Sequence, residues 1–160
     1  MANVERESIH FIREVAVRYV GRSARVAPAI EKPADATAFL RRVVRDDARE
    51  HFVALYLDGR NRPVAHQVVS IGTASASLVH PREVFQPAIL VGACAVIVGH
   101  NHPSGDATPS REDRAITQRL ARAGSLLGIA LLDSLVFTRG GDFVSLRELD
   151  ATLFVGGSDR

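Results

Sequence analysis

Two histidines and one aspartate occur in the sequence at spacings that suit a metal ion. His100 and His102 follow an apolar run, and residues two apart in an extended chain point to the same side. We therefore expect two imidazoles side by side at the end of a buried strand, where their neutral ring nitrogens can chelate one ion. A single histidine at a strand end is usually a surface residue. Two histidines at this spacing indicate a pair of ligands for one metal ion.

Asp113 is predicted to reach the same place from the helix that follows. The apolar residues of this helix cluster in one arc, formed by Ile116, Leu120, Ala123 and Leu127. Asp113 lies beside that arc and should point inward, where an uncompensated carboxylate is costly. Two explanations remain open. Asp113 can form a capping box with Ser110 at the N-cap, or it can bind a metal ion together with the two histidines.

Two histidines and one aspartate leave one tetrahedral position for water, as in catalytic zinc sites. Zinc lowers the pKa of such a water to about 7. Amide hydrolysis also needs a carboxylate that transfers protons and a donor that stabilises the oxyanion. Glu50, at the start of the first predicted strand, and Ser110 are the candidates for these two roles. Three other glutamates compete with Glu50: Glu31, Glu83 and Glu112.

Helices and strands alternate along the chain, which predicts a layered α/β domain. Helices are expected at 5–20, 33–47, 81–91 and 110–127, and strands at 51–58, 63–71, 93–98, 129–138 and 142–145. Strand 93–98 is apolar on both faces and should be central, with Cys94 as a core residue. Pro87 predicts a kink or a later start of its helix.

Composition limits the class of protein. The chain has 160 residues, 46% of them hydrophobic, a formal charge of +2 and one cysteine. One cysteine excludes an internal disulfide framework and any zinc site built on several thiolates. The longest apolar run, 88–99, is too short to span a bilayer, and no signal-peptide pattern is present. We expect a cytoplasmic globular protein without a membrane partner, and no pattern predicts its oligomeric state.

The motif formed by His100, His102, Ser110 and Asp113 resembles the H-x-H-x7-S-x2-D signature of JAMM/MPN+ metalloproteases. The surrounding segment 100–113 is similar to the RadC branch of that family, and segments 49–52, 81–83, 131–133 and 144–146 agree with it. The resemblance implies a three-layer α-β-α domain with a mixed central sheet, related to the cytidine-deaminase fold. It also implies Zn²⁺ bound by His100, His102 and Asp113. Ser110 would assist the tetrahedral intermediate, and Glu50 would be the general base.

The expected activity is that of a zinc metallopeptidase or isopeptidase acting on a peptide or protein. The alternative is a DNA-repair-associated accessory protein that binds nucleic acid and carries a structural metal. Residues 1–32, a predicted helix and connector, lack the Gly-rich hairpins of the helix-hairpin-helix region that usually precedes this domain in RadC proteins. This weakens the expectation of duplex binding. The RadC-like domain is expected at 33–150 and a tail at 151–160; the family's Asp-His pair is Asp133-Ser134 here.

Overall fold

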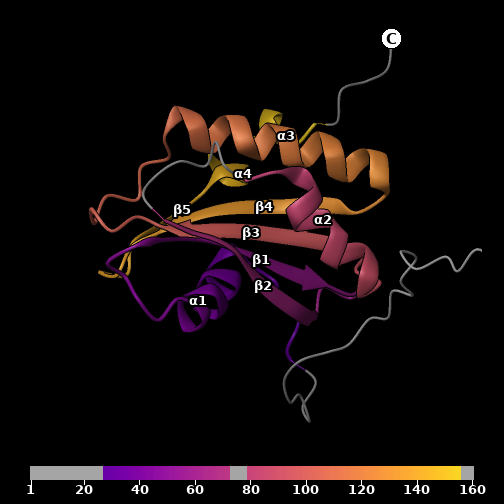
Figure 1. Cartoon of the computed structure of the whole chain (residues 1–160), viewed down its shortest axis with the longest axis horizontal. Coiled ribbons are helices and arrows are strands. Elements are labelled where there is room, and N and C mark those ends of the chain that lie inside the picture. The colour runs from indigo at the N-terminus through magenta and orange to yellow at the C-terminus, as the bar shows by residue number, and fades with distance from the viewer. Residues whose placement is uncertain (1–26, 73–78, 156–160) are drawn as a thin grey trace, which may run out of the picture.

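The protein is built around a five-stranded sheet with helices packed on both of its faces (Figure 1). The computed structural model describes residues 27–72 and 79–155. The strands are β1 (Glu50–Leu57), β2 (Pro63–Gly72), β3 (Ala95–Asn101), β4 (Ala130–Phe137) and β5 (Phe143–Ser145). The helices are α1 (Pro33–Val43), α2 (Pro81–Leu90), α3 (Arg111–Leu127), α4 (Leu146–Leu149) and the 3₁₀ helix η2 (Ala151–Phe154). The helix expected at 5–20 lies outside the described residues.

The sheet is mixed, with strand order β2-β1-β3-β4-β5. Strands β3 and β4 are parallel, and the other neighbours are antiparallel. Helix α1 covers one face, while α2 and α3 cover the other (Figure 1). The predicted three-layer α/β fold is therefore confirmed. In the described ranges, no helix has the length and apolar character needed to cross a bilayer.

Strand β1 has apolar residues on both faces because it is covered from both sides. Alternate residues Phe52, Ala54 and Tyr56 pack in the core formed with α2 and α3. The residues between them, Val53, Leu55 and Leu57, pack in the core formed with α1. Strand β3, its antiparallel neighbour, is buried along its whole length. A central strand that is covered on both faces needs a nearly continuous apolar sequence, and the apolar residues 93–98 predict such a strand.

The pairing of β1 with β3 positions the site. Phe52 lies opposite His100, so the beginning of β1 is adjacent to the end of β3. The chain leaves β3, passes through a loop and enters α3, which crosses over to the parallel strand β4. Glu50, His100 and the first turn of α3 consequently meet at one end of the sheet.

Strand β3 begins later than the sequence predicts, and Cys94 is exposed. The backbone turns at Gly92, which has a φ of 66°, and the Cys94 amide then donates to the carbonyl of Leu57. Cys94 therefore lies in the connection before the strand, and its prediction as a core residue is wrong. Its apolar neighbours suggested burial, but Cys94 follows a turn at the end of α2, where the Ala93 amide donates to the carbonyl of Ala88.

Two helix boundaries also differ from expectation. Helix α2 begins at Pro81 and continues through Pro87, so a later start is wrong. Helix α1 ends at Val43 rather than near residue 47. The carboxylate of Asp46 accepts hydrogen bonds from the Ala48 amide and from Arg49, which stabilises a turn in place of a further helical turn.

The buried face of helix α3 agrees with the prediction at Ile116 and Leu120 and differs from it toward the end of the helix, where Ala123 is only partly buried. Leu127 is half exposed, although it was expected on the buried face. The buried residues are Asp113, Ile116, Thr117, Leu120, Ala121 and Gly124. Gly124 allows a close approach to Phe85 and to the carbonyl of Ile129, and the helix ends at Gly128 with a φ of 69°. This close contact, which the apolar pattern does not reveal, shifts the buried face toward Gly124.

Gly124→Ala is expected to destabilise the domain by about 1–3 kcal/mol, because overpacking outweighs the gain in helix propensity. An added Cβ would overlap the carbonyl oxygen of Ile129 and lie 3.0 Å from Cζ of Phe85. Urea unfolding measures the change. Gly140→Ala is the control, because the nearest contact of its Cβ would be Thr138 Oγ1 at 3.8 Å. Equal or greater stability of Gly124→Ala would contradict the packing argument.

Candidate metal centre

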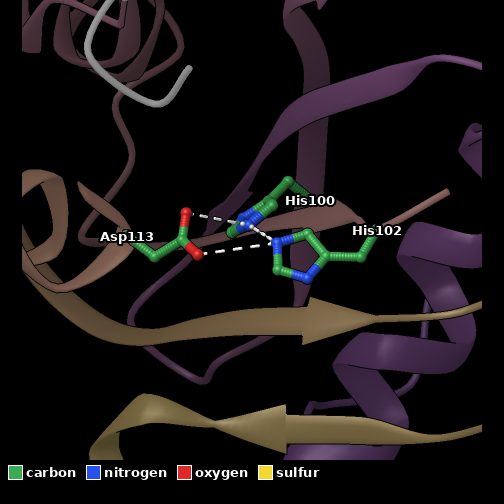
Figure 2. Close-up of side chains that lie close together, drawn as sticks. All are labelled: His100, His102 and Asp113. Carbon is green, nitrogen blue, oxygen red and sulfur yellow. Dashed lines mark hydrogen bonds and ion pairs between the residues drawn. The ribbon is translucent and has the colours of Figure 1, made fainter. Parts of the chain in front are cut away.

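His100, His102 and Asp113 converge at the end of β3 and the start of α3 (Figure 2). The two histidine Nε2 atoms are 3.0 Å apart. Asp113 places Oδ1 3.0 Å from Nε2 of His100 and Oδ2 3.5 Å from Nε2 of His102. Ligand atoms around a tetrahedral zinc ion are about 3.3 Å apart, given zinc–ligand distances of about 2.0–2.1 Å. These three side chains are therefore spaced to hold one metal ion.

His102 is held in the tautomer that a metal ligand requires. Its Nδ1 lies 2.7 Å from the carbonyl oxygen of Asp106. A carbonyl only accepts, so Nδ1 carries the hydrogen and a neutral ring has its lone pair on Nε2. That lone pair belongs to the nitrogen facing Asp113 and His100. Ligating histidines commonly donate their second N–H to a carbonyl in this way.

His100 is almost fully buried, with 1% of its surface exposed, and its ring stacks on Phe52 at a centroid distance of 5.9 Å. Among the described residues its Nδ1 has no hydrogen-bond partner, so its polar contacts are made through Nε2. Nε2 can supply at most one hydrogen to the lone pairs of His102 and Asp113 that surround it. A shared cation satisfies all of these groups at once, and the donor set fits zinc.

Asp113 forms the capping box, and its position is also compatible with metal binding together with the two histidines. In the capping box, Ser110 Oγ accepts from the Asp113 amide at 3.1 Å and Asp113 Oδ2 accepts from the Ser110 amide at 2.7 Å. Oδ1, however, faces His100. The side chain is only 4% exposed. Capping is therefore present, but it leaves Oδ1 directed at His100, while Oδ2 both caps the helix and lies near His102.

The electrostatics of the cluster favour a carboxylate anion next to a cation. Burial of Asp113 opposes its ionisation, but hydrogen bonds from His100 and His102 outweigh this and hold the Asp113 pKa well below its ordinary value. The hydrogen bond to Asp113 raises the pKa of His102, against the effect of burial. The raised pKa of His102 favours a proton on its imidazole, which would place positive charge beside the Asp113 carboxylate. A bound metal ion would replace that proton.

Stabilisation by zinc should therefore increase between pH 6 and pH 8. In the metal-free domain, the raised His102 pKa contributes stability below about pH 6.5, and this is lost as the pH rises through the folded pKa. The lowered Asp113 pKa contributes stability above about pH 3.9, and this is lost as the pH falls through the folded pKa. Zinc needs a neutral imidazole, so raising the pH weakens the metal-free state and favours binding.

The measurement is the difference in Tm between zinc-loaded and chelator-treated protein at each pH. Asp113→Asn serves as the control, because the difference should then be small at every pH. A difference that decreases from pH 6 to pH 8 would contradict this interpretation.

Glu50 and Ser110 both lie at this centre. Glu50 Oε1 is 3.9 Å from Nε2 of His100, and its side chain is 14% exposed. Ser110 is an exposed residue whose hydroxyl uses a lone pair to cap α3 and keeps a hydrogen that it can donate. Within residues 27–72 and 79–155, Glu50 is the glutamate paired with the cluster. The three competing glutamates are exposed: Glu31, Glu83 and Glu112.

A cavity of about 450 Å³ opens beside His102. Its charged lining comes from the connection between α1 and β1 and from the turn after β4, with Arg45, Asp46, Asp47 and Arg139. Asp47 and Arg139 form an ion pair at 3.8 Å. These residues could not be predicted from the sequence, because they belong to two loops far apart in the chain and form no local motif.

The sequence is similar to a known domain family and to several curated proteins. A sequence profile of the family described as RadC-like JAB domain matches residues 30–151. A UPF0758 protein of Rubrobacter xylanophilus is 46% identical over 121 residues, which cover 76% of this chain and 52% of that protein. A UPF0758 protein of Geobacillus sp. (strain WCH70) is 48% identical over 121 residues, covering 74% and 52%.

A third relative, a UPF0758 protein of Methanosarcina acetivorans, is 47% identical over 116 residues, covering 72% of this chain and 50% of that protein. The chain thus spans about half the length of the curated relatives it matches. The matched region contains all five strands and the His100, His102 and Asp113 cluster. The chain belongs to the RadC-like JAB domain family.

Proposed function

We propose that this domain is a zinc-dependent metallohydrolase that cleaves amide bonds in peptides or proteins. One observation carries the proposal: the Asp113 carboxylate faces two adjacent imidazole nitrogens, with Oδ1 toward His100 and Oδ2 toward His102, although the same carboxylate also caps α3. A cap alone does not require two histidines at this position. The family assignment supports the same interpretation.

His100, His102 and Asp113 would hold the ion. Two imidazole nitrogens and one carboxylate suit zinc, whereas calcium and magnesium prefer oxygen ligands. Three protein ligands leave one coordination position free, which distinguishes catalytic zinc sites from structural ones. When bound here, zinc would supply Lewis-acid activation of water near neutral pH.

Two further side chains would carry out the remaining steps. The Glu50 carboxylate, next to His100, would accept a proton from the attacking water and return it to the leaving amine. The Ser110 hydroxyl would donate a hydrogen bond to the oxyanion that develops on the carbonyl oxygen. The cavity beside His102 offers a place for the polypeptide that carries the scissile bond.

The test combines metal analysis with a cleavage screen of peptides and isopeptide-linked substrates. We expect about one zinc per chain, loss of cleavage on chelation and recovery when zinc is added back. Protein that binds no zinc, or cleavage that is indifferent to chelation, would overturn the proposal. Duplex DNA affinity that falls steeply with salt, in a protein without zinc-dependent cleavage, would instead favour the nucleic-acid accessory role.

A further inference from the structure

Asn101, between the two histidines, uses its side-chain amide to bind β1 on both sides of Glu50. Its Oδ1 accepts from the main-chain amide of His51 at 2.8 Å. Its Nδ2 donates to the carbonyl oxygen of Arg49 at 2.9 Å. Asn101 is 1% exposed; its bond to the His51 amide is buried, where it does not compete with water, and its bond to the Arg49 carbonyl is partly buried.

These bonds lie where the main-chain ladder between β1 and β3 stops. The last aligned pair at this end is Phe52 with His100. Beyond it, the Asn101 side chain bonds to the peptide groups that flank Glu50. The carboxylate of Glu50 then lies 3.9 Å from Nε2 of His100. The same strand end thus provides the ligand His100 and the amide that holds the neighbouring acid.

An asparagine suits this position because one planar group both donates and accepts. Aspartate retains the acceptor for His51 but has no hydrogen for the Arg49 carbonyl. Alanine loses both bonds. We propose that Asn101 is a positioning residue for Glu50, which clamps the two peptide groups around it and holds its carboxylate beside His100 and His102. This inference rests on the proposed function, because it assigns Glu50 a task at the metal.

The first test does not depend on activity. The protein is loaded with Co²⁺ as a paramagnetic substitute for zinc, and the metal-induced NMR shifts of the Glu50 and His51 amides are compared between variants. In Asn101→Ala and Asn101→Asp we expect the metal-induced shifts of these two amides to become smaller or their signals to broaden. The metal-induced shifts of other amides around the metal should stay the same. Unchanged shifts at both amides would overturn the inference.

The matched control is Ser145→Ala. Ser145 is also buried and donates to a buried carboxylate, Asp133, at 2.7 Å, but it lies on β5, away from Glu50. This control should alter the Tm without altering the Co²⁺-induced shifts of Glu50 and His51. A general loss of packing would affect the control and the Asn101 variants alike, and that outcome would count against a positioning role.

The second test uses hydrolysis of a substrate found in the cleavage screen. Asn101→Ala should lower kcat by about a hundredfold, the effect of misplacing a reacting group by about 1 Å, and leave KM and zinc content unchanged. In a Glu50→Gln background the same substitution should have no further effect. An equal loss of kcat in both backgrounds would show that Asn101 does not act through Glu50.

The two proposals can fail separately. If Asn101→Ala changes the Co²⁺-induced shifts but Glu50→Gln hydrolyses at the wild-type rate, the clamp is supported and the proposed role of Glu50 is overturned. If Glu50→Gln loses activity and Asn101→Ala retains it, the proposed function stands and the positioning role is overturned.

Discussion

Glu50→Gln should bind zinc normally and hydrolyse its substrate about 10²–10⁴-fold more slowly than the wild type. The substitution keeps the size of the side chain but removes the group that accepts a proton. The Glu50 carboxylate lies 3.9 Å from Nε2 of His100, beside the three groups that would hold the metal. Zinc content by metal analysis and kcat at neutral pH are the two measurements.

Glu83→Gln is the matched control for Glu50→Gln. Glu83 is an exposed glutamate that caps the start of α2, where its carboxylate accepts from the His80 amide at 3.0 Å. The control should therefore affect stability slightly and leave kcat near the wild-type value. Wild-type kcat in Glu50→Gln, or a comparable loss in Glu83→Gln, would show that Glu50 is not the general base.

Asp113→Asn should reduce bound zinc from about one per chain to almost none. The substitution replaces an anionic ligand by a neutral amide at a position where two histidine nitrogens also converge. Carboxylate ligands bind as anions, so both the charge and the strong donor oxygen are lost. The asparagine oxygen can still accept from the Ser110 amide, so the cap of α3 is largely preserved.

This variant separates the two roles of Asp113. If the carboxylate acted only as a cap, Asp113→Asn would retain zinc and change only the unfolding free energy. Glu112→Gln is the control, because Glu112 is the exposed acidic neighbour in the same first helical turn. It removes an equal charge close by and should leave the zinc content unchanged.

The candidate metal-binding group could be predicted from sequence because its geometry is mostly local. His100 and His102 are two residues apart at the end of a strand, so the alternation of side chains already places them together. Asp113 lies at the third position of a capped helix that starts a few residues later. The layered α/β class could also be predicted, since each strand and helix carries its own periodicity.

Only the tertiary structure could decide features that depend on non-local pairing. Glu50 approaches His100 because β1 and β3 pair in one particular register, which no local pattern specifies. The same pairing brings Asn101 to the peptide groups around Glu50.

Packing between elements decided the remaining differences. Cys94 is exposed because the chain turns at Gly92 before β3. The buried face of α3 shifts toward Gly124 because the missing side chain of this glycine lets Phe85 pack closely against the helix. The sequence alone determined which residues can bind the metal and on which elements they lie, because side-chain periodicity follows backbone geometry. The tertiary structure decided which acid stands beside them, because strand register and close helix packing arise from contacts between distant segments.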